Sequence, residues 1–401
     1  MKLGGGALLL GGIALVAAAA FGSRALGVAG IGLVLAGILG RVWVVLARSR
    51  AWAVVSVDPS PATEGDAVRL RVEVRRESRV PIGSATLRAR IGRLGDAGCR
   101  LRGHGAAASG EISLGRPPRG RFRISDAVLE LGDPLGLESV ALPLELPAAV
   151  VVQPRLVELQ TLFSDAGRLG SDGRRLLLRR HAGFDFHSVR GYEQGESLRR
   201  VHWPTTARRG QLMVKELEEA PHDTVAVLLD CDSAGAAGTP PDSSFDAAVR
   251  AAGSVLRAYS VRGRRATLVT TGSDGATVGI GSLASDFGAV LAALAAAEPD
   301  ARHPLDHMLG RTRSPVSLAG ELVVVTGVLE VRAVDRLLEA ASRRIVSVVW
   351  VDAPSFAGRP TRAAAGVLRL TAAGVPVAVV RRGDDLRAAL SVPRVETRAR
   401  A

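Results

Sequence analysis

The distribution of apolar and polar residues predicts a membrane segment at the start of the chain. No charged residue occurs from Leu3 to Phe21, and a second apolar stretch runs from about Ala25 to Leu46 after the break "GSRALG". Each stretch is long enough to cross a bilayer as a helix, so we predict two transmembrane helices within residues 1–50. A cleaved signal peptide ending near "AAAAFGS" is the alternative for the first stretch, although such a peptide would not be followed by a second span.

The positions of the cations predict the orientation of these helices. Lys2 precedes the pair, Arg24 lies between the helices, and Arg41, Arg48 and Arg50 follow the second one. Lysine and arginine are enriched on the cytoplasmic side of membrane helices. We therefore expect a multi-pass protein with both termini and its large domains in the cytoplasm.

Residues 51–155 show the alternation that is typical of half-buried strands. In "AVRLRVEVRRE", Val68, Leu70, Val72 and Val74 alternate with polar neighbours, and Gly, Pro and Asp separate this stretch from several similar ones. Short strands of this kind, joined by turns, predict a β-sandwich-like domain.

Residues 221–401 combine continuous apolar runs such as "TVAVLL" with amphipathic helical stretches, and residues 156–220 form a linker and a signature segment between the two domains. Apolar strands alternating with helices predict an α/β domain with a doubly wound parallel sheet. Ligands of such sheets bind at the carboxyl ends of the strands. This rule singles out Asp230 and Asp232 after one strand and Thr326 after a later one.

The net charge of +13 does not indicate a nucleic-acid surface. Only Lys2 and Lys215 are lysines, and the arginines are dispersed beside acids. Residues 183–220 hold equal numbers of cations and acids, whereas phosphate binding requires a net positive stripe. The cysteines, Cys99 and Cys231, are too few for a disulfide framework.

Motifs of catalysis are missing from the sequence. No Walker A, zincin or Gly-x-Ser-x-Gly motif occurs. His303 and His307, with Asp306 between them, have a spacing that could hold a metal on a helix, but no third ligand is evident. We therefore expect a protein that is not an enzyme and has no cofactor.

The stretch "DCDSA" resembles the metal site of the von Willebrand factor A fold, which has the pattern Asp-x-Ser-x-Ser. Asp230 matches its first position, whereas Asp232 and Ala234 replace the serines, and Gly327 follows Thr326 where many such domains have Asp. The resemblance implies a degraded site of Asp230, Asp232 and Thr326 that holds magnesium poorly or not at all. A metal-dependent binding module or hydrolase that uses Asp230 and Asp232 is the alternative function.

The segment "RGYEQGESLRRVHWPTTARRGQLMVKE" is dense in charged and aromatic residues. Glu196 and Arg199 are spaced to meet on one helical turn, and paired arginines and carboxylates around a buried aromatic residue fix geometry. We interpret the segment as a structural clamp around a buried Trp203.

This segment resembles the signature of the bacterial domain-of-unknown-function 58 family, and "PPRGRFRISDAVLELGDPLGL" and "VVVQPRLVEL" resemble the stretch that precedes that signature. The matching positions are Arg190, Tyr192, Gly195, Arg199, Trp203, Ala207 and Arg208, and Glu196 stands where Asp is usual.

The resemblance implies the same order of parts, namely two transmembrane helices, a β-rich segment, the signature and a domain resembling von Willebrand factor A. It also implies a bacterial plasma membrane as the location, and partners among MoxR-type AAA+ ATPases and other membrane proteins of the same operon. The function that it implies is a membrane-anchored adaptor in the assembly or maturation of client proteins.

Overall fold

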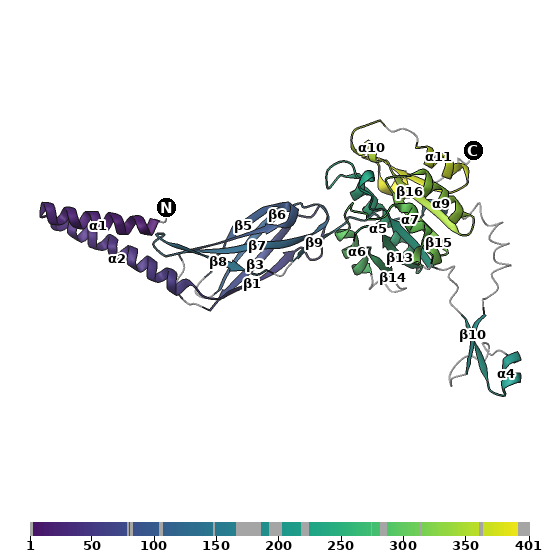
Figure 1. The fold of residues 1–401 in the computed structure, drawn as a ribbon, viewed down its shortest axis with the longest axis horizontal. Coiled ribbons are helices and arrows are strands. Elements are labelled where there is room, and N and C mark those ends of the chain that lie inside the picture. The colour runs from purple at the N-terminus through teal and green to yellow at the C-terminus, as the bar shows by residue number, and fades with distance from the viewer. Residues whose placement is uncertain are drawn as a thin grey trace, which may run out of the picture. The chain divides into compact units, whose positions relative to one another are not determined.

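The structure is a computed structural model, and it describes residues 3–77, 80, 83–103, 107–146, 149–165, 186–191, 203–217, 224–273, 275–280, 287–312, 314–360 and 364–391. The chain divides into two units, Met1–Arg155 and Leu156–Ala401 (Figure 1). Each unit has its own hydrophobic core.

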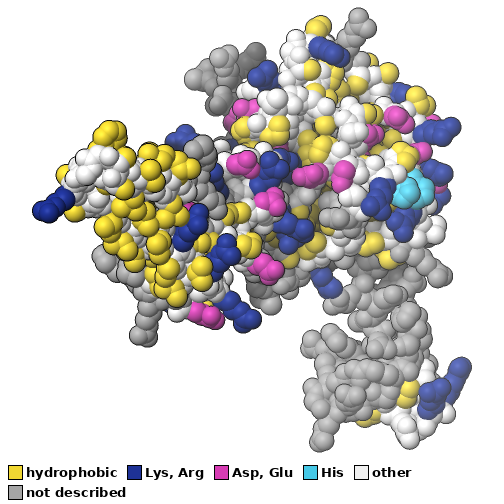
Figure 2. Space-filling model, turned by 60° about the vertical axis from the view of Figure 1, so that its left-hand side comes forward, with side chains coloured by type: hydrophobic (Ala, Val, Ile, Leu, Met, Phe, Trp, Pro, Cys, Tyr) yellow, Lys and Arg dark blue, Asp and Glu magenta, His cyan; other side chains and the backbone are white. Residues whose placement is uncertain are grey.

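The first unit begins with a pair of apolar helices, α1 (Leu3–Phe21) and α2 (Arg24–Ala47). The Ser23 hydroxyl caps α2 by accepting a hydrogen bond from the Leu26 amide at 3.4 Å. Of the described helices, α2 alone is long and apolar enough to cross a membrane, and the apolar part of α1, Gly5–Phe21, is shorter. Figure 2 shows that hydrophobic side chains cover much of the visible surface of this helix pair.

Two sheets follow the helices in the first unit. Their order is β1-β3-β6 in one, and β2-β9-β7-β4-β5 in the other, with β8 paired to β7. The strands are β1 (Ala51–Asp58), β2 (Ala62–Thr63), β3 (Val68–Arg76), β4 (Ser84–Ile91), β5 (Asp96–Arg100), β6 (Ala107–Gly115), β7 (Gly120–Gly132), β8 (Ser139–Leu144) and β9 (Ala149–Gln153), with a 3-10 turn at Gly92–Leu94.

Both sheets of the first unit contribute side chains to one core. Along β3 every second residue is buried. These residues are Val68, Leu70, Val72 and Val74, which the alternation singles out, and Arg76 at the end of the strand. Trp43 and Ala47, in the last two turns of α2, belong to the same core. The end of α2 is therefore part of the packing of the β-rich domain.

The second unit contains a small hairpin and an α/β domain. The hairpin joins β10 (Phe186–Gly191) to β11 (Met213–Leu217) and carries α4 (Trp203–Arg209) between its strands. The α/β domain has β12 (Thr224–Leu229), the 3-10 turn η4 (Ser233–Gly235), α5 (Ser244–Val261), β13 (Arg265–Thr270), β14 (Thr277–Ile280), α6 (Phe287–Ala296), α7 (Leu305–Gly310), α8 (Pro315–Leu318), β15 (Glu321–Thr326), α9 (Val331–Ala341), β16 (Ile345–Val351), α10 (Ala353–Phe356), α11 (Ala365–Ala372), β17 (Val377–Val380) and α12 (Leu386–Leu390).

The sheet of the α/β domain has the order β14-β13-β12-β15-β16-β17. Adjacent strands within it are parallel, except that β13 and β14 are antiparallel. Successive residues of β12 point into different cores. Val225 and Val227 face the core that holds α5 and α6, whereas Ala226 and Leu228 face the core that holds α7 and α9. Helices therefore cover both faces of the sheet, and only its edges and the ends of its strands are left to form a site.

Candidate functional site

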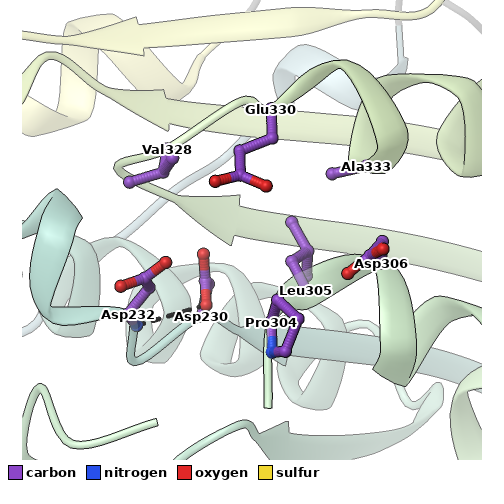
Figure 3. Close-up of a pocket in the computed structure, with 8 residues that line it drawn as sticks. All are labelled: Asp230, Asp232, Pro304, Leu305, Asp306, Val328, Glu330 and Ala333. Carbon is purple, nitrogen blue, oxygen red and sulfur yellow. Dashed lines mark hydrogen bonds between the residues drawn. The ribbon is translucent and has the colours of Figure 1, made fainter.

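A crevice opens where β12 and β15 end (Figure 3). Its lining residues come from the turns after these strands and from the starts of α7 and α9, and they are Asp230, Asp232, Pro304, Leu305, Asp306, Val328, Glu330 and Ala333. Figure 3 shows the Glu330 carboxylate pointing from one side of the crevice toward Asp230 and Asp232 on the other. The site is acidic, and it lies where the parallel sheet predicts a ligand site.

Asp230 is the buried residue of this crevice, with 5% of its surface exposed. Its Oδ2 accepts a hydrogen bond from the Thr326 hydroxyl at 2.7 Å. Its Oδ1 accepts from the Thr271 hydroxyl and from the Asp232 amide, each at 3.2 Å. The structure thus brings Asp230 and Thr326 together, and it adds Thr271, which the sequence analysis missed although it follows the neighbouring strand β13.

Burial raises the pKa of the Asp230 carboxyl above its ordinary value, and the charge of Asp232 acts in the same direction, while the hydrogen bonds from Thr326 and Thr271 oppose the rise. The folded protein therefore binds the proton of this acid more tightly than the unfolded chain does. Its contribution to stability is greatest below the ordinary pKa of 3.8 and is lost as pH rises through the raised pKa.

We expect Asp230→Asn to be tolerated and Asp230→Ala to be destabilising. The side-chain NH2 of an asparagine can donate to the Thr326 hydroxyl, and this hydroxyl can then donate to the Val328 carbonyl, which lies 2.7 Å away. The side-chain carbonyl of the asparagine can accept the hydrogen bond from the Thr271 hydroxyl. Alanine removes every one of these partners, which typically costs about 1–3 kcal/mol for buried polar groups.

Thermal unfolding of the full chain at several pH values measures both changes. Asp230→Asn should match the parent at acidic pH and gain stability relative to it as pH rises. Equal melting temperatures for the alanine variant and the parent would contradict the structural role of Asp230.

Asp232 is held by the turn in which it lies. Its Oδ1 accepts a hydrogen bond from the Ala234 amide at 2.9 Å and so caps the 3-10 turn η4. Capping is the ordinary use of an aspartate at the start of a helical turn. The position of Asp232 therefore has a structural cause that is independent of any ligand.

The turns after β12 and β15 touch through their glycines. A Cβ on Gly327 would lie 2.7 Å from the Gly235 backbone oxygen, and a Cβ on Gly235 would lie 3.0 Å from the Gly327 Cα. No side chain fits at either position without moving the backbone. The glycine that follows Thr326 is thus required by the packing of the two turns.

These contacts bear on whether the crevice suits a magnesium ion. Magnesium demands several oxygen ligands in near-octahedral geometry, whereas both oxygens of Asp230 already accept hydrogen bonds and Ala234 offers no side-chain oxygen. Among the described residues no group of three or more His, Cys, Asp or Glu side chains has metal-binding geometry. Asp230, Asp232 and Thr326 therefore offer few free oxygens to a magnesium ion.

Two further groups near the crevice can be assessed as reactive groups. Burial and the charge of Asp230 raise the pKa of the Cys231 thiol to about 11, so this thiol is protonated at neutral pH and is a poor nucleophile. The rings of His303 and His307 lie 4.7 Å apart between centroids. The Cys231 thiol is therefore not an activated nucleophile.

The signature segment is described only in part. Tyr192, Gly195, Glu196 and Arg199 lie outside the described residues, and of Arg190 only the backbone, in β10, is described. Ala207 and Arg208 lie exposed on α4.

The expectation of a buried Trp203 is wrong, because 64% of this residue is exposed at the start of α4. The mixture of charged and aromatic residues suggested a clamp but carried no information on which face of the short helix would be covered. An exposed Trp cannot serve as the aromatic centre of a clamp.

We expect Trp203→Ala to change the free energy of unfolding by no more than about 0.5 kcal/mol, as for most surface substitutions. The measurement is thermal melting of the full chain. A loss of several kcal/mol would show that Trp203 is covered in the intact protein and would restore the clamp.

Comparison with known proteins places these residues within a recognised family. The model of the family described as "Protein of unknown function DUF58" matches residues 188–372. The chain is also similar to the uncharacterized protein YeaD of Bacillus subtilis (strain 168), with 27% identity over 217 residues. That similarity covers 54% of this chain and 52% of YeaD, so the chain spans about half the length of the relative that it matches. The family match runs from β10 to the end of α11 and includes the crevice.

Proposed function

Because this chain belongs to the DUF58 family of proteins of unknown function, we propose its function from its apolar helices and its crevice. It is a membrane-anchored, non-enzymatic adaptor that presents its α/β domain to protein partners. The observation that carries this proposal is the state of Asp230, whose two carboxylate oxygens are both engaged in hydrogen bonds within the fold.

The anchor in this proposal is a hairpin in which both α1 and α2 cross the bilayer. Support comes from the close approach of the helices, because a Cβ on Gly11 would lie 2.8 Å from Val34 Cγ2 and 3.0 Å from the Gly30 carbonyl oxygen. Small residues at such contacts are typical of helices that associate within membranes. The cations at either end of the hairpin support an orientation in which both termini and the two large domains lie in the cytoplasm of a bacterium.

The α/β domain in this proposal is of the von Willebrand factor A type. The sheet order and the parallel pairing of its central strands support this assignment. The adaptor works with a MoxR-type AAA+ ATPase and with other membrane proteins of its operon in the assembly or maturation of client proteins.

Affinity capture tests the adaptor function. The tagged full chain is solubilised from membranes and captured with and without ATP, and Glu330→Arg is compared with Glu339→Arg. Glu330 is an exposed acid at the crevice, whereas Glu339 is a half-exposed acid farther along α9. We expect an AAA+ ATPase to be captured by the parent and by Glu339→Arg but not by Glu330→Arg. Capture of no AAA+ ATPase by the parent would refute the partnership.

The alternative function is a metal-dependent binding module or hydrolase at Asp230 and Asp232. The observation that favours it is the gathering of four carboxylates, those of Asp230, Asp232, Asp306 and Glu330, around one crevice. Acidic crevices at strand ends are a common place for divalent cations.

We expect the full chain to show no low-micromolar binding of magnesium or manganese, because both Asp230 oxygens are hydrogen-bonded within the fold and the described carboxylates form no group of three with metal-binding geometry. Titration calorimetry of the chain in detergent micelles measures this, with Asp230→Ala as the control variant. Low-micromolar binding that disappears in Asp230→Ala would establish the alternative.

A further inference from the structure

The loop between β7 and β8, residues 133–138, presents an apolar side chain on a rigid turn. The Gly136 amide donates to the Asp133 carbonyl at 3.0 Å, and Gly136 adopts a φ of 70°. The Glu138 amide donates to Asp133 Oδ1 at 2.9 Å. These bonds hold the loop, and Leu135 at its tip is 61% exposed.

This loop lies against the membrane helix α2. A Cβ on Gly40 would lie 3.3 Å from the Glu138 Cγ and 3.5 Å from the Asp133 Oδ2. The absence of a side chain at Gly40 is what lets the loop approach the helix so closely. The depth of Gly40 in the membrane therefore gives the depth of the loop.

The packing of α1 on α2 gives that depth. Gly11 of α1 packs against Gly30 and Val34 of α2, so in an antiparallel pair Leu3, eight residues earlier, lies level with roughly residue 40 of α2. The 19 residues of α1 extend over ~28 Å, which is about the thickness of the hydrocarbon core. Gly40 is thus level with the start of α1, at one face of the bilayer.

We propose that the loop of residues 133–138 rests on the bilayer and inserts Leu135 at the boundary between lipid headgroups and acyl chains. This inference rests on the proposed membrane anchor. The occupant is a phospholipid bilayer, because α2 exposes Leu39 and Val42 at the same level, by 61% and 49%, and a membrane that covers these side chains also meets Leu135. The Asp133 carboxyl, with 3% of the residue exposed, is turned inward and does not oppose insertion.

Quenching by spin-labelled lipids tests the inference. The full chain is reconstituted into phosphatidylcholine vesicles after replacement of Cys99 and Cys231 by alanine, and the environment-sensitive fluorophore NBD is attached at Leu135→Cys or at Arg116→Cys. Arg116 is exposed just before β7, at the opposite end of this 13-residue strand, and so is ~40 Å from the loop. It carries the same label on the same domain and is the matched control.

We expect a lipid with its nitroxide near the headgroup to quench the label at position 135 at least about twofold more than the label at position 116, since interfacial side chains lie within about 5–10 Å of the headgroup boundary. Equal quenching in protein that floats with the vesicles would overturn the inference and leave the anchor intact. Protein that does not float with the vesicles would overturn both the inference and the proposed anchor.

Discussion

Replacing Arg264 by methionine is expected to lower the free energy of unfolding of the α/β domain by about 3–5 kcal/mol, the usual cost of leaving one partner of a buried ion pair alone. Glu321, the first residue of β15, is 1% exposed, and its carboxylate accepts hydrogen bonds from the Arg264 guanidinium and the Tyr259 hydroxyl. Methionine preserves the apolar stem of Arg264 but removes the guanidinium charge that is paired with the Glu321 carboxylate.

The double variant Arg264→Met with Glu321→Met is the control. Replacing a buried ion pair as a whole with apolar side chains is often neutral, so the double variant should regain most of the stability that the single variant loses. Hydrogen exchange of peptides that cover β12 and β15 measures both changes in the full chain. Unchanged exchange in Arg264→Met would show that water or another group replaces the guanidinium.

Gly327→Asp should destabilise the domain and should fail to create a metal site. Its Cβ would press on the Gly235 backbone, which typically costs ~1–3 kcal/mol and occasionally more, and the new carboxylate would lie near Asp230, whose pKa is already raised. An acid at position 327 would therefore push the two turns apart.

Gly288→Asp is the matched control for this substitution. Gly288 lies in the first turn of α6, where a Cβ would meet no atom within 4 Å, and an acid at a helix start is favourable. We expect this control to melt like the parent or slightly above it. If Gly327→Asp melts like Gly288→Asp and binds manganese, the packing account of Gly327 is wrong.

The elements of this fold could be predicted where a single strand or helix carries its own signal. The alternation of Val68, Leu70, Val72 and Val74 marks β3 because each is buried while its neighbours point outward. The uninterrupted run of β12 marks a strand that is covered on both faces. Such patterns are local, so they survive without knowledge of the rest of the chain.

The parts of the site that depend on contact between distant turns could not be predicted in the same way. The sequence shows only that glycine stands at position 327 where an acid was considered. The reason for the glycine is the close approach of the Gly235 backbone, and Gly235 lies 92 positions earlier in the chain. Thr271 was in a predictable place, after a strand, but only the structure shows its hydroxyl bonded to Asp230. Trp203 was misjudged because its neighbours in sequence do not determine which side of α4 is covered.

Trp43 and Ala47 are packed in the core of the β-rich domain. This packing fixes how α2 is rotated about its own axis relative to the two sheets. An α-helix turns by about 100° per residue, so one residue inserted just before Gly40 would rotate the preceding part of α2 by that angle relative to the sheets. Seven inserted residues, close to two full turns, would restore the facing while moving the domain ~10 Å along the helix axis. The β-rich domain is thus held at a fixed angle about the axis of α2 and is not joined to it by a flexible tether.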